Sequence, residues 1–224
     1  MPKIPTPLAV DYALKPLASA STTVERLSDG RTRYAIEHEL LRGVTPAMIV
    51  WFLNHMTDVI ELAGERVQRY RAWHPRDHIQ LTYLRPADDG SNCGAGSQLR
   101  IEEAFGGDPK LAINVVATVD FLDETGFAHY EVQAGLRVAR MDYSFEQTPE
   151  GTLYRNALTV GRAGSGPLSW LINRVVQPLV FPHAKGMAWI QHNVEEVGTF
   201  EAFLPQMYER DNSDHQADER GGRG

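Results

Sequence analysis

The sequence predicts an α+β fold in which a curved antiparallel sheet wraps a long C-terminal helix. Two patterns lead to this prediction: a series of short strand-like segments between residues 78 and 160, and a mostly helical segment over Leu168–Leu204. The chain has 224 residues, of which 42% are hydrophobic, so it can bury a sizeable core as one large domain. A sheet that curves around a helix leaves a cavity between the two, which suits a flat apolar ligand.

The N-terminal third is predicted to hold an arm, a strand pair and two helices. Four prolines predict an extended surface arm over residues 1–21. Strand-forming residues that recur at every second position predict a pair of strands over Thr22–Leu41, with the turn at Asp29. A Thr-Pro start and apolar residues at helical spacing predict a helix from Pro46 to about Gly64. A second helix is predicted over Glu65–Ala72.

The rest of the chain is predicted to form an antiparallel meander, a bent helix and a tail. The predicted strands are His78–Leu84, Gln98–Ala104, Leu111–Phe121, Ala128–Ala139, Met141–Gln147 and Leu153–Val160, separated by Gly, Asp and Pro. Pro178 and Pro182 are expected to bend the last helix. The polar, Gly-rich residues 211–224 are predicted to be disordered, which leaves a single domain over residues 22–210.

Composition excludes several classes of function. The formal net charge is −7 and basic residues do not cluster with aromatic ones, so we expect no nucleic-acid partner. The longest apolar stretch, Ala47–Leu53, is too short to cross a bilayer, and we expect no membrane partner. The N-terminus lacks the features of a secretory signal, so we expect a cytoplasmic protein. The oligomeric state is not predicted, and a homodimer stays open.

The last helix carries the strongest local signal for chemistry. His192 and Glu196 are four residues apart, so they project from the same helix face, which also carries Trp189, Phe200 and Phe203. A carboxylate buried on such a face needs a partner, and a divalent cation would serve. The alternative is an ordinary stabilising pair at a solvated rim. Glu195 lies one residue off this face and is expected to be solvated.

Two further segments add groups of the same kind. The segment Tyr70–His78 (YRAWHPRDH) packs two imidazoles, a phenol and an acid into a turn between a helix and a strand. Its alternative interpretation is a packing and capping cluster in which the histidines bond to the backbone. Strand alternation puts Glu103 on the apolar, inward face and Glu102 on the outward face. Alternatively, both acids lie at an exposed edge.

Together these segments predict a mixed nitrogen and oxygen metal site. Its ligands would be two histidines and two glutamates from a turn, a strand and a helix, with either His74 or His78 as the first imidazole. Cys93 is the single cysteine, so a thiolate cluster within one chain is excluded. Zn²⁺ is the default ion, although Fe²⁺ and Mn²⁺ suit the same ligands. Asp77 is predicted to accept a proton from an imidazole of the site.

These motifs resemble those of the diacetylphloroglucinol hydrolase family. The resemblance spans roughly Pro46–Tyr208, and its most specific part is the Trp-His-Pro-Arg-Asp-His element at residues 73–78. It implies a helix-grip fold of the Bet v 1 or START type. It also implies a zinc-dependent hydrolase that cleaves the carbon–carbon bond between an acyl group and a phenolic ring. The implied partner is a small aromatic ketone.

The resemblance also implies roles for individual residues. It implies four metal ligands: His78, Glu103, His192 and Glu196. His74 is the alternative to His78 as a ligand. If His78 is the ligand, His74 is expected to be a catalytic residue. Tyr70 is also expected to be catalytic and to lie near the substrate. Tyr143 stands where the family usually has a histidine, and His129 is a candidate to substitute for it.

The predicted mechanism has a metal-activated water attack the acyl carbonyl while a tyrosine, Tyr70 or Tyr143, protonates the ring. An aromatic wall is predicted from Trp51, Phe105 and Trp189. One alternative is a non-catalytic binding protein or carrier for aromatic polyketides or lipid-like molecules, because the same fold serves both roles. Another is an iron enzyme that uses oxygen on the same ligands.

Overall fold

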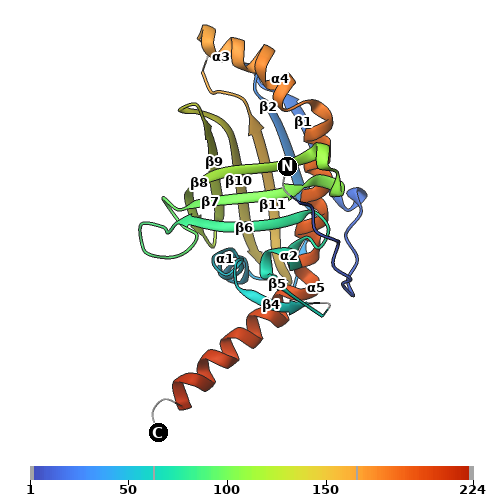
Figure 1. Cartoon of the computed structure of the whole chain (residues 1–224), viewed down its shortest axis with the longest axis vertical. Coiled ribbons are helices and arrows are strands. Elements are labelled where there is room, and N and C mark those ends of the chain that lie inside the picture. The colour runs from blue at the N-terminus through green and yellow to red at the C-terminus, as the bar shows by residue number, and fades with distance from the viewer. Residues whose placement is uncertain (1–2, 63, 165, 222–224) are drawn as a thin grey trace.

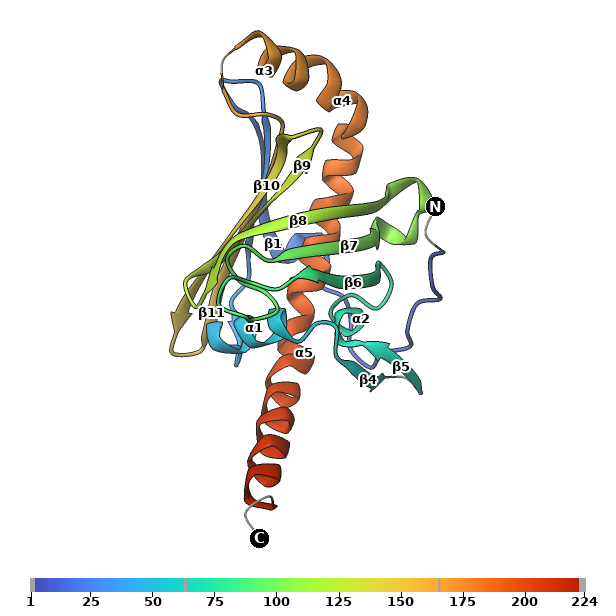
Figure 2. The same cartoon turned by 60° about the vertical axis from the view of Figure 1, so that its left-hand side comes forward.

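The long helix α5 (His183–Gly221) lies in the concave face of a curved antiparallel sheet, as Figures 1 and 2 show. The structure is a computed structural model, and it describes residues 3–62, 64–164 and 166–221, with side chains to residue 213. Within these ranges, nine strands form the main sheet. This arrangement is a helix grip, so the predicted fold class is confirmed.

The main sheet begins and ends with hairpins that are far apart in the sequence. Its strands are β1 (Ala20–Arg26), β2 (Thr32–His38), β3 (Leu41–Arg42), β6 (His78–Arg85), β7 (Gln98–Ala104), β8 (Ala112–Asp123), β9 (Gly126–Gln133), β10 (Leu136–Thr148) and β11 (Gly151–Val160). Their order is β1-β2-β11-β10-β9-β8-β7-β6, with β3 paired to β11. The antiparallel meander from β6 to β11 matches the prediction except for the bounds of one strand, and its first two strands, β6 and β7, form one end of the sheet.

The predicted strand Ala128–Ala139 is wrong, because the chain reverses within it. β9 ends at Gln133 and β10 begins at Leu136, and the two strands pair in antiparallel register. The turn residues, Ala134 and Gly135, have φ values of 50° and 76°. A tight hairpin turn needs positive φ, for which alanine gives no sequence signal.

The predicted helices after residue 45 are only partly correct. Helix α1 (Pro46–Asn54) is shorter than expected, and the following residues form a small hairpin of β4 (Val59–Leu62) and β5 (Glu65–Gln68). Only α2 (Arg69–Trp73) of the second predicted helix is helical. Gly64 turns the hairpin with a φ of 78°, which an interior helix position does not allow. α2 leads directly into the turn before β6.

The C-terminal helices are bent where proline predicts a bend. α3 (Pro167–Leu171) continues through a π-helical turn (Ile172–Val176) into α4 (Gln177–Val180), and a break before Pro182 separates α4 from α5. The backbone of α5 continues to Gly221, although the sequence predicts disorder from residue 211. In the described part of the chain, no helix combines the length and apolar character that a membrane span requires.

The N-terminal arm lies against the turn that precedes β6. Residues 3–16 have no regular secondary structure. The Leu8 backbone N–H donates to the Pro75 carbonyl oxygen at 3.1 Å, and the Tyr12 hydroxyl donates to the Ala72 carbonyl oxygen. These contacts cover the segment that carries the histidines of the predicted site.

Candidate metal centre

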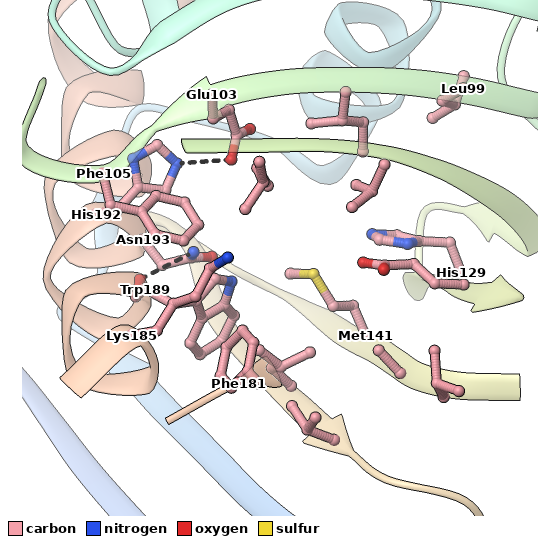
Figure 3. A pocket seen from close by; sticks show the side chains of 18 of the residues that line it. Leu99, Glu103, Phe105, His129, Met141, Phe181, Lys185, Trp189, His192 and Asn193 are labelled. Atoms are coloured by element: carbon pink, nitrogen blue, oxygen red, sulfur yellow. Dashed lines mark hydrogen bonds and ion pairs between the residues drawn. The ribbon is translucent and has the colours of Figure 1, made fainter. Parts of the chain in front are cut away.

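The four predicted ligands are carried by three elements that meet on the concave side of the sheet. His78 is the first residue of β6, and its direct partner in the register with β7 is Glu103. His192 and Glu196 lie one turn apart on the face of α5 that packs on the sheet. Figure 3 shows Glu103 and His192 pointing toward each other from β7 and α5.

The structure brings all four side chains into one buried cluster. The Nε2 atom of His78 lies 3.1 Å from a Glu196 carboxylate oxygen and 3.5 Å from one of Glu103. The Nε2 atom of His192 lies 3.5 Å from Glu196 and 3.6 Å from Glu103. Each residue is 9% exposed or less. His78, and not its alternative His74, therefore lies beside the two glutamates.

A hydrogen bond at the Nδ1 atom orients each imidazole of the cluster. The Nδ1 atom of His78 lies 2.7 Å from the Tyr70 carbonyl oxygen, and that of His192 lies 3.0 Å from an Asp77 carboxylate oxygen. Both acceptors require a proton on Nδ1, so each neutral ring presents the lone pair of Nε2 to the two glutamates. This arrangement is typical of metal-ligating histidines. It confirms the prediction that Asp77 accepts an imidazole proton.

The cluster needs a positive charge at its centre. Two buried carboxylates and two nitrogen lone pairs repel one another unless protons or a cation lie between them. Burial opposes the protonation of His192, but the negative charges of Glu103 and Glu196 outweigh it and raise its pKa well above the usual value. One ligand atom each from His78, Glu103 and His192 lies within 4.8 Å of the others. These residues could therefore hold a metal ion.

Tyr70 completes the inner face of the cluster. Its hydroxyl donates a hydrogen bond to Glu103, and its ring stacks on His78 with centroids 3.8 Å apart. Burial and the nearby Glu103 charge raise the pKa of Tyr70 well above its usual value. The phenol therefore stays protonated and fixes one oxygen of Glu103.

A second layer of ion pairs supports the imidazoles. Arg76 donates to Asp77 at 2.7 Å and to Glu195 at 2.6 Å, while the His74 Nε2 atom lies 3.1 Å from the same Glu195 oxygen. The His74 Nδ1 atom accepts the backbone N–H of Asp77 at 3.1 Å. Both ring nitrogens of His74 are thus engaged away from the four-residue cluster. Glu195 is buried, so its predicted solvation is wrong, because Arg76 reaches it across the turn.

The cluster borders an apolar cavity between the sheet and α5. The cavity volume is about 230 Å³, and Glu103, His192 and Glu196 form part of its lining. Two of the three predicted wall residues, Phe105 and Trp189, also line it. Trp51 instead packs edge-on against Tyr208, with centroids 5.3 Å apart, and is not among the lining residues.

His129, the candidate to substitute for the family histidine, lies elsewhere on the cavity wall together with Glu131, which sequence reasoning did not single out. His129 and Glu131 are two residues apart on β9 and both line the cavity (Figure 3 shows His129). The His129 Nδ1 atom is buried and has no hydrogen-bond partner among the described residues, and its Nε2 atom lies 3.5 Å from the Tyr143 hydroxyl. Burial lowers the pKa of His129 to about 4 and raises that of Glu131 to about 7. Strand alternation pairs the two residues on one face, but it does not show which face is inward.

Comparisons with known proteins support no assignment beyond the fold. No protein-family model matches the sequence, and no curated protein matches it. Similar solved structures include Ara h 8.0201, at 15% identity, 73% coverage of this chain, 97% of that chain and a TM-score of 0.39. A START superfamily protein from Mycobacterium smegmatis has 15% identity, coverages of 73% and 98%, and a TM-score of 0.40. The di-domain ARO/CYC protein BexL has 8% identity, coverages of 75% and 51%, and a TM-score of 0.41.

Fold and site together define a class. The chain is a helix-grip protein with an apolar cavity beside a buried cluster of two histidines and two glutamates. Apolar side chains make up most of the cavity wall, and the cluster places groups that could hold a metal ion against it.

Proposed function

We propose that the protein is a metal-dependent hydrolase that cleaves the carbon–carbon bond between an acyl group and a phenolic ring. The observation that carries the proposal is the convergence of His78, Glu103, His192 and Glu196 in one cluster, three of whose members line an apolar cavity. The resemblance of the segment 73–78 to the diacetylphloroglucinol hydrolases supports the reaction type. A purely structural cluster would have no need to border a cavity.

The donor set favours zinc. Two ligand atoms that lie about 2.0–2.1 Å from a zinc ion at a tetrahedral angle are about 3.4 Å apart. The shortest distances from the two imidazole nitrogens to the two carboxylates run from 3.1 to 3.6 Å, with a different Glu103 oxygen nearest to each imidazole. Fe²⁺ and Mn²⁺ accept the same donors, so metal analysis has to distinguish the three ions.

The proposed reaction is a hydrolysis without a redox step. The bond between the acyl carbon and the ring carbon breaks, the acyl carbon takes a hydroxyl group from water, and the ring carbon keeps the electron pair and takes a proton. A metal bound to the four ligands would lower the pKa of a coordinated water and polarise the acyl carbonyl. The apolar walls exclude other water and hold the flat ring between Phe105 and Trp189.

In this proposal Tyr143 transfers a proton, whereas Tyr70 positions a metal ligand. Tyr143 lines the cavity, and burial raises its pKa well above the usual value, so its hydroxyl stays protonated. It donates the proton that the leaving ring carbon takes, and the proton that the attacking water loses restores its hydroxyl. Tyr70 is engaged with Glu103 and positions that carboxylate. His74 acts as a positioning residue through Asp77 and Glu195, because both of its ring nitrogens are already bonded.

The test is the release of acetate from monoacetylphloroglucinol or diacetylphloroglucinol by the zinc-loaded protein. We expect the wild type to release acetate and Glu103→Gln to lose about 10³-fold or more of the rate, because the ligand set is broken. Glu102→Gln is the matched control, since Glu102 is the next residue on β7 and bonds to Asn114 on the outer side. It should keep the wild-type rate.

The alternative function, a non-catalytic carrier for aromatic or lipid-like molecules, predicts a different result. A carrier binds the acylphloroglucinol tightly, releases no acetate with any of the three metals, and contains no stoichiometric metal when purified. That combination would refute the hydrolase proposal.

A further inference from the structure

The helical segment that follows β11 and precedes α5 along the chain buries polar side chains and exposes apolar ones. We call residues 167–180, which comprise α3, the π-helical turn and α4, the apical helix. Ser169, Asn173 and Gln177, spaced four residues apart, are its buried side chains. A helix on a globular protein normally buries its apolar stripe and exposes its polar one. Here the polar stripe faces the protein.

Hydrogen bonds hold the apical helix in this orientation. The Asn173 side-chain amide donates to the carbonyl oxygens of Asp29 and Arg162, each at 2.9 Å, and its oxygen accepts the Arg162 backbone N–H at 2.7 Å. Arg26 donates to the Asn173 carbonyl oxygen at 2.7 Å. A rotation that buried the apolar stripe would break all four bonds. The outward position of the apolar side chains is therefore built into the fold.

The apical helix exposes seven large apolar side chains within residues 168–180. Its exposed side chains are Leu168, Trp170, Leu171, Val175, Val176, Leu179 and Val180, and Leu179 is 78% exposed. Both Figure 1 and Figure 2 place the apical helix at one end of the molecule, opposite the C-terminus of α5. Exposed apolar side chains on a monomer are normally scattered, and a contiguous group marks a contact surface.

The charge of this region of the chain favours an anionic contact partner. The chain has a net charge of −7, yet residues 151–194 contain no acidic residue, and the one charged residue of the apical helix is Arg174. Arg174 is exposed on the apical helix itself. A second copy of the chain packed symmetrically on this stripe would bring two Arg174 side chains together. An anionic lipid surface offers an apolar layer and opposite charge at once.

The same segment forms the edge of the cavity. Val176 and Val180 are exposed and also belong to the cavity lining, as do Phe181 and Lys185 just beyond them. The cavity therefore reaches the surface beside the apolar stripe. A molecule dissolved in the bilayer boundary could enter it without crossing bulk water.

We propose that the apical helix docks on the surface of an anionic lipid bilayer, with its apolar stripe at the boundary between headgroups and acyl chains. Arg174 then lies among the lipid phosphates, and the cavity opens toward the membrane. This inference does not depend on the proposed reaction. The sequence argument against a membrane partner concerned a spanning segment, whereas surface docking needs only one exposed face.

The experiment is co-sedimentation of the full chain with vesicles of phosphatidylcholine, with and without phosphatidylglycerol. We expect binding to the phosphatidylglycerol vesicles, weaker binding to the neutral ones, and loss of the difference in high salt. The fluorescence of Trp170 should shift to the blue on binding, and Trp170→Phe should remove that shift.

Two matched pairs of variants test the surface. Leu171→Glu should weaken vesicle binding about tenfold or more, because a charge enters the apolar boundary. Leu84→Glu should leave it unchanged, since Leu84 on β6 is 44% exposed against 46% for Leu171. Arg174→Glu should abolish the preference for anionic lipid, while Arg100→Glu on β7 should keep it.

Three results would overturn the inference. The first is failure of the folded wild-type protein to bind anionic vesicles. The second is equal loss of binding in Leu84→Glu and Leu171→Glu. The third is a wild-type dimer in sedimentation velocity that Leu171→Glu converts to a monomer, which would identify a second copy of the chain as the occupant.

Discussion

Asp77 shows how one buried carboxylate organises the candidate metal centre. It accepts from the His192 Nδ1 atom, from Arg76 and from the Gly106 backbone N–H. Burial opposes its ionisation, but His192 and Arg76 outweigh burial and hold its pKa well below the usual value. Asp77 therefore remains ionised and keeps the proton of His192 on Nδ1.

We predict that Asp77→Asn weakens zinc binding about 10- to 100-fold, because the orientation and basicity of His192 depend on the carboxylate. Competition with a chromophoric chelator measures the affinity. Asp142→Asn is the matched control, since Asp142 also pairs with an arginine at 2.7 Å, on β10. Equal affinity in the two variants would contradict the role of Asp77.

Glu131 makes the stability of the protein depend on pH. Its pKa is raised by burial from 4.5 to about 7, so the folded state holds a proton that the unfolded state has already lost. The unfolding free energy therefore falls as the pH rises from about 4.5 to about 7, and no further loss occurs above that.

Glu131→Gln removes this ionisation. We predict that the variant is more stable than the wild type by about 2 kcal/mol at pH 8, and that the difference disappears near pH 4.5. Urea unfolding at a series of pH values measures it. A difference that does not change with pH would show that Glu131 titrates normally.

At the scale of elements, α5 is shaped by what it packs against more than by its own helix propensity. Gly186 lies in its first turns, where alanine would normally be preferred by about 1 kcal/mol. A Cβ atom there would overlap the ring of Tyr34, which is buried on β2. Contact with the sheet therefore requires glycine.

We predict that Gly186→Ala destabilises the protein by about 1–3 kcal/mol despite the gain in propensity, because neither the helix nor the Tyr34 ring can move freely. Gly166→Ala, just before α3, is the control: φ is −74° and no atom lies near the added Cβ, so the change should stay within about 0.5 kcal/mol. Chemical denaturation compares the two. Stabilisation by Gly186→Ala would mean that the helix lies farther from β2.

Residues 59–68 show why element type was harder to predict than element position. Val59 and Ile60 fit the apolar period of the preceding helix, but their branched side chains are equally suited to a strand. The Gly64 turn and the pairing of β4 with β5 decide the outcome. Thr45, by contrast, caps α1 as expected and accepts the Met48 N–H at 3.2 Å, because a cap is a local interaction.

At the scale of the whole molecule, a bound ion would tie together three distant segments of the chain. β6, β7 and α5 each supply ligands, so the folded state binds the ion through groups that are separated after unfolding. A ligand present at 100 times its dissociation constant stabilises the folded state by about 2.7 kcal/mol.

We therefore predict that a chelator lowers the melting temperature of the wild type by several degrees and that added zinc restores it. His192→Ala should show the same melting temperature with and without chelator. Differential scanning fluorimetry is sufficient for this comparison. A chelator effect of the same size in both proteins would place the ion elsewhere.

The sequence alone determined the features that depend on neighbours along the chain. Helix spacing placed His192 and Glu196 on one face, strand alternation turned Glu103 inward, and the meander followed from its turn residues. These are periodic properties of the backbone, so they can be inferred without knowing what packs against them.

Only the tertiary structure decided which groups from distant segments meet. It placed His78 among the glutamates while His74 turned to Glu195, it buried Glu195 beneath Arg76, and it left an apolar stripe on the outside of the apical helix. Each outcome depends on contacts across more than a hundred residues of sequence or on the orientation of a whole element. No local pattern carries that information, because the competing arrangements satisfy the same backbone geometry.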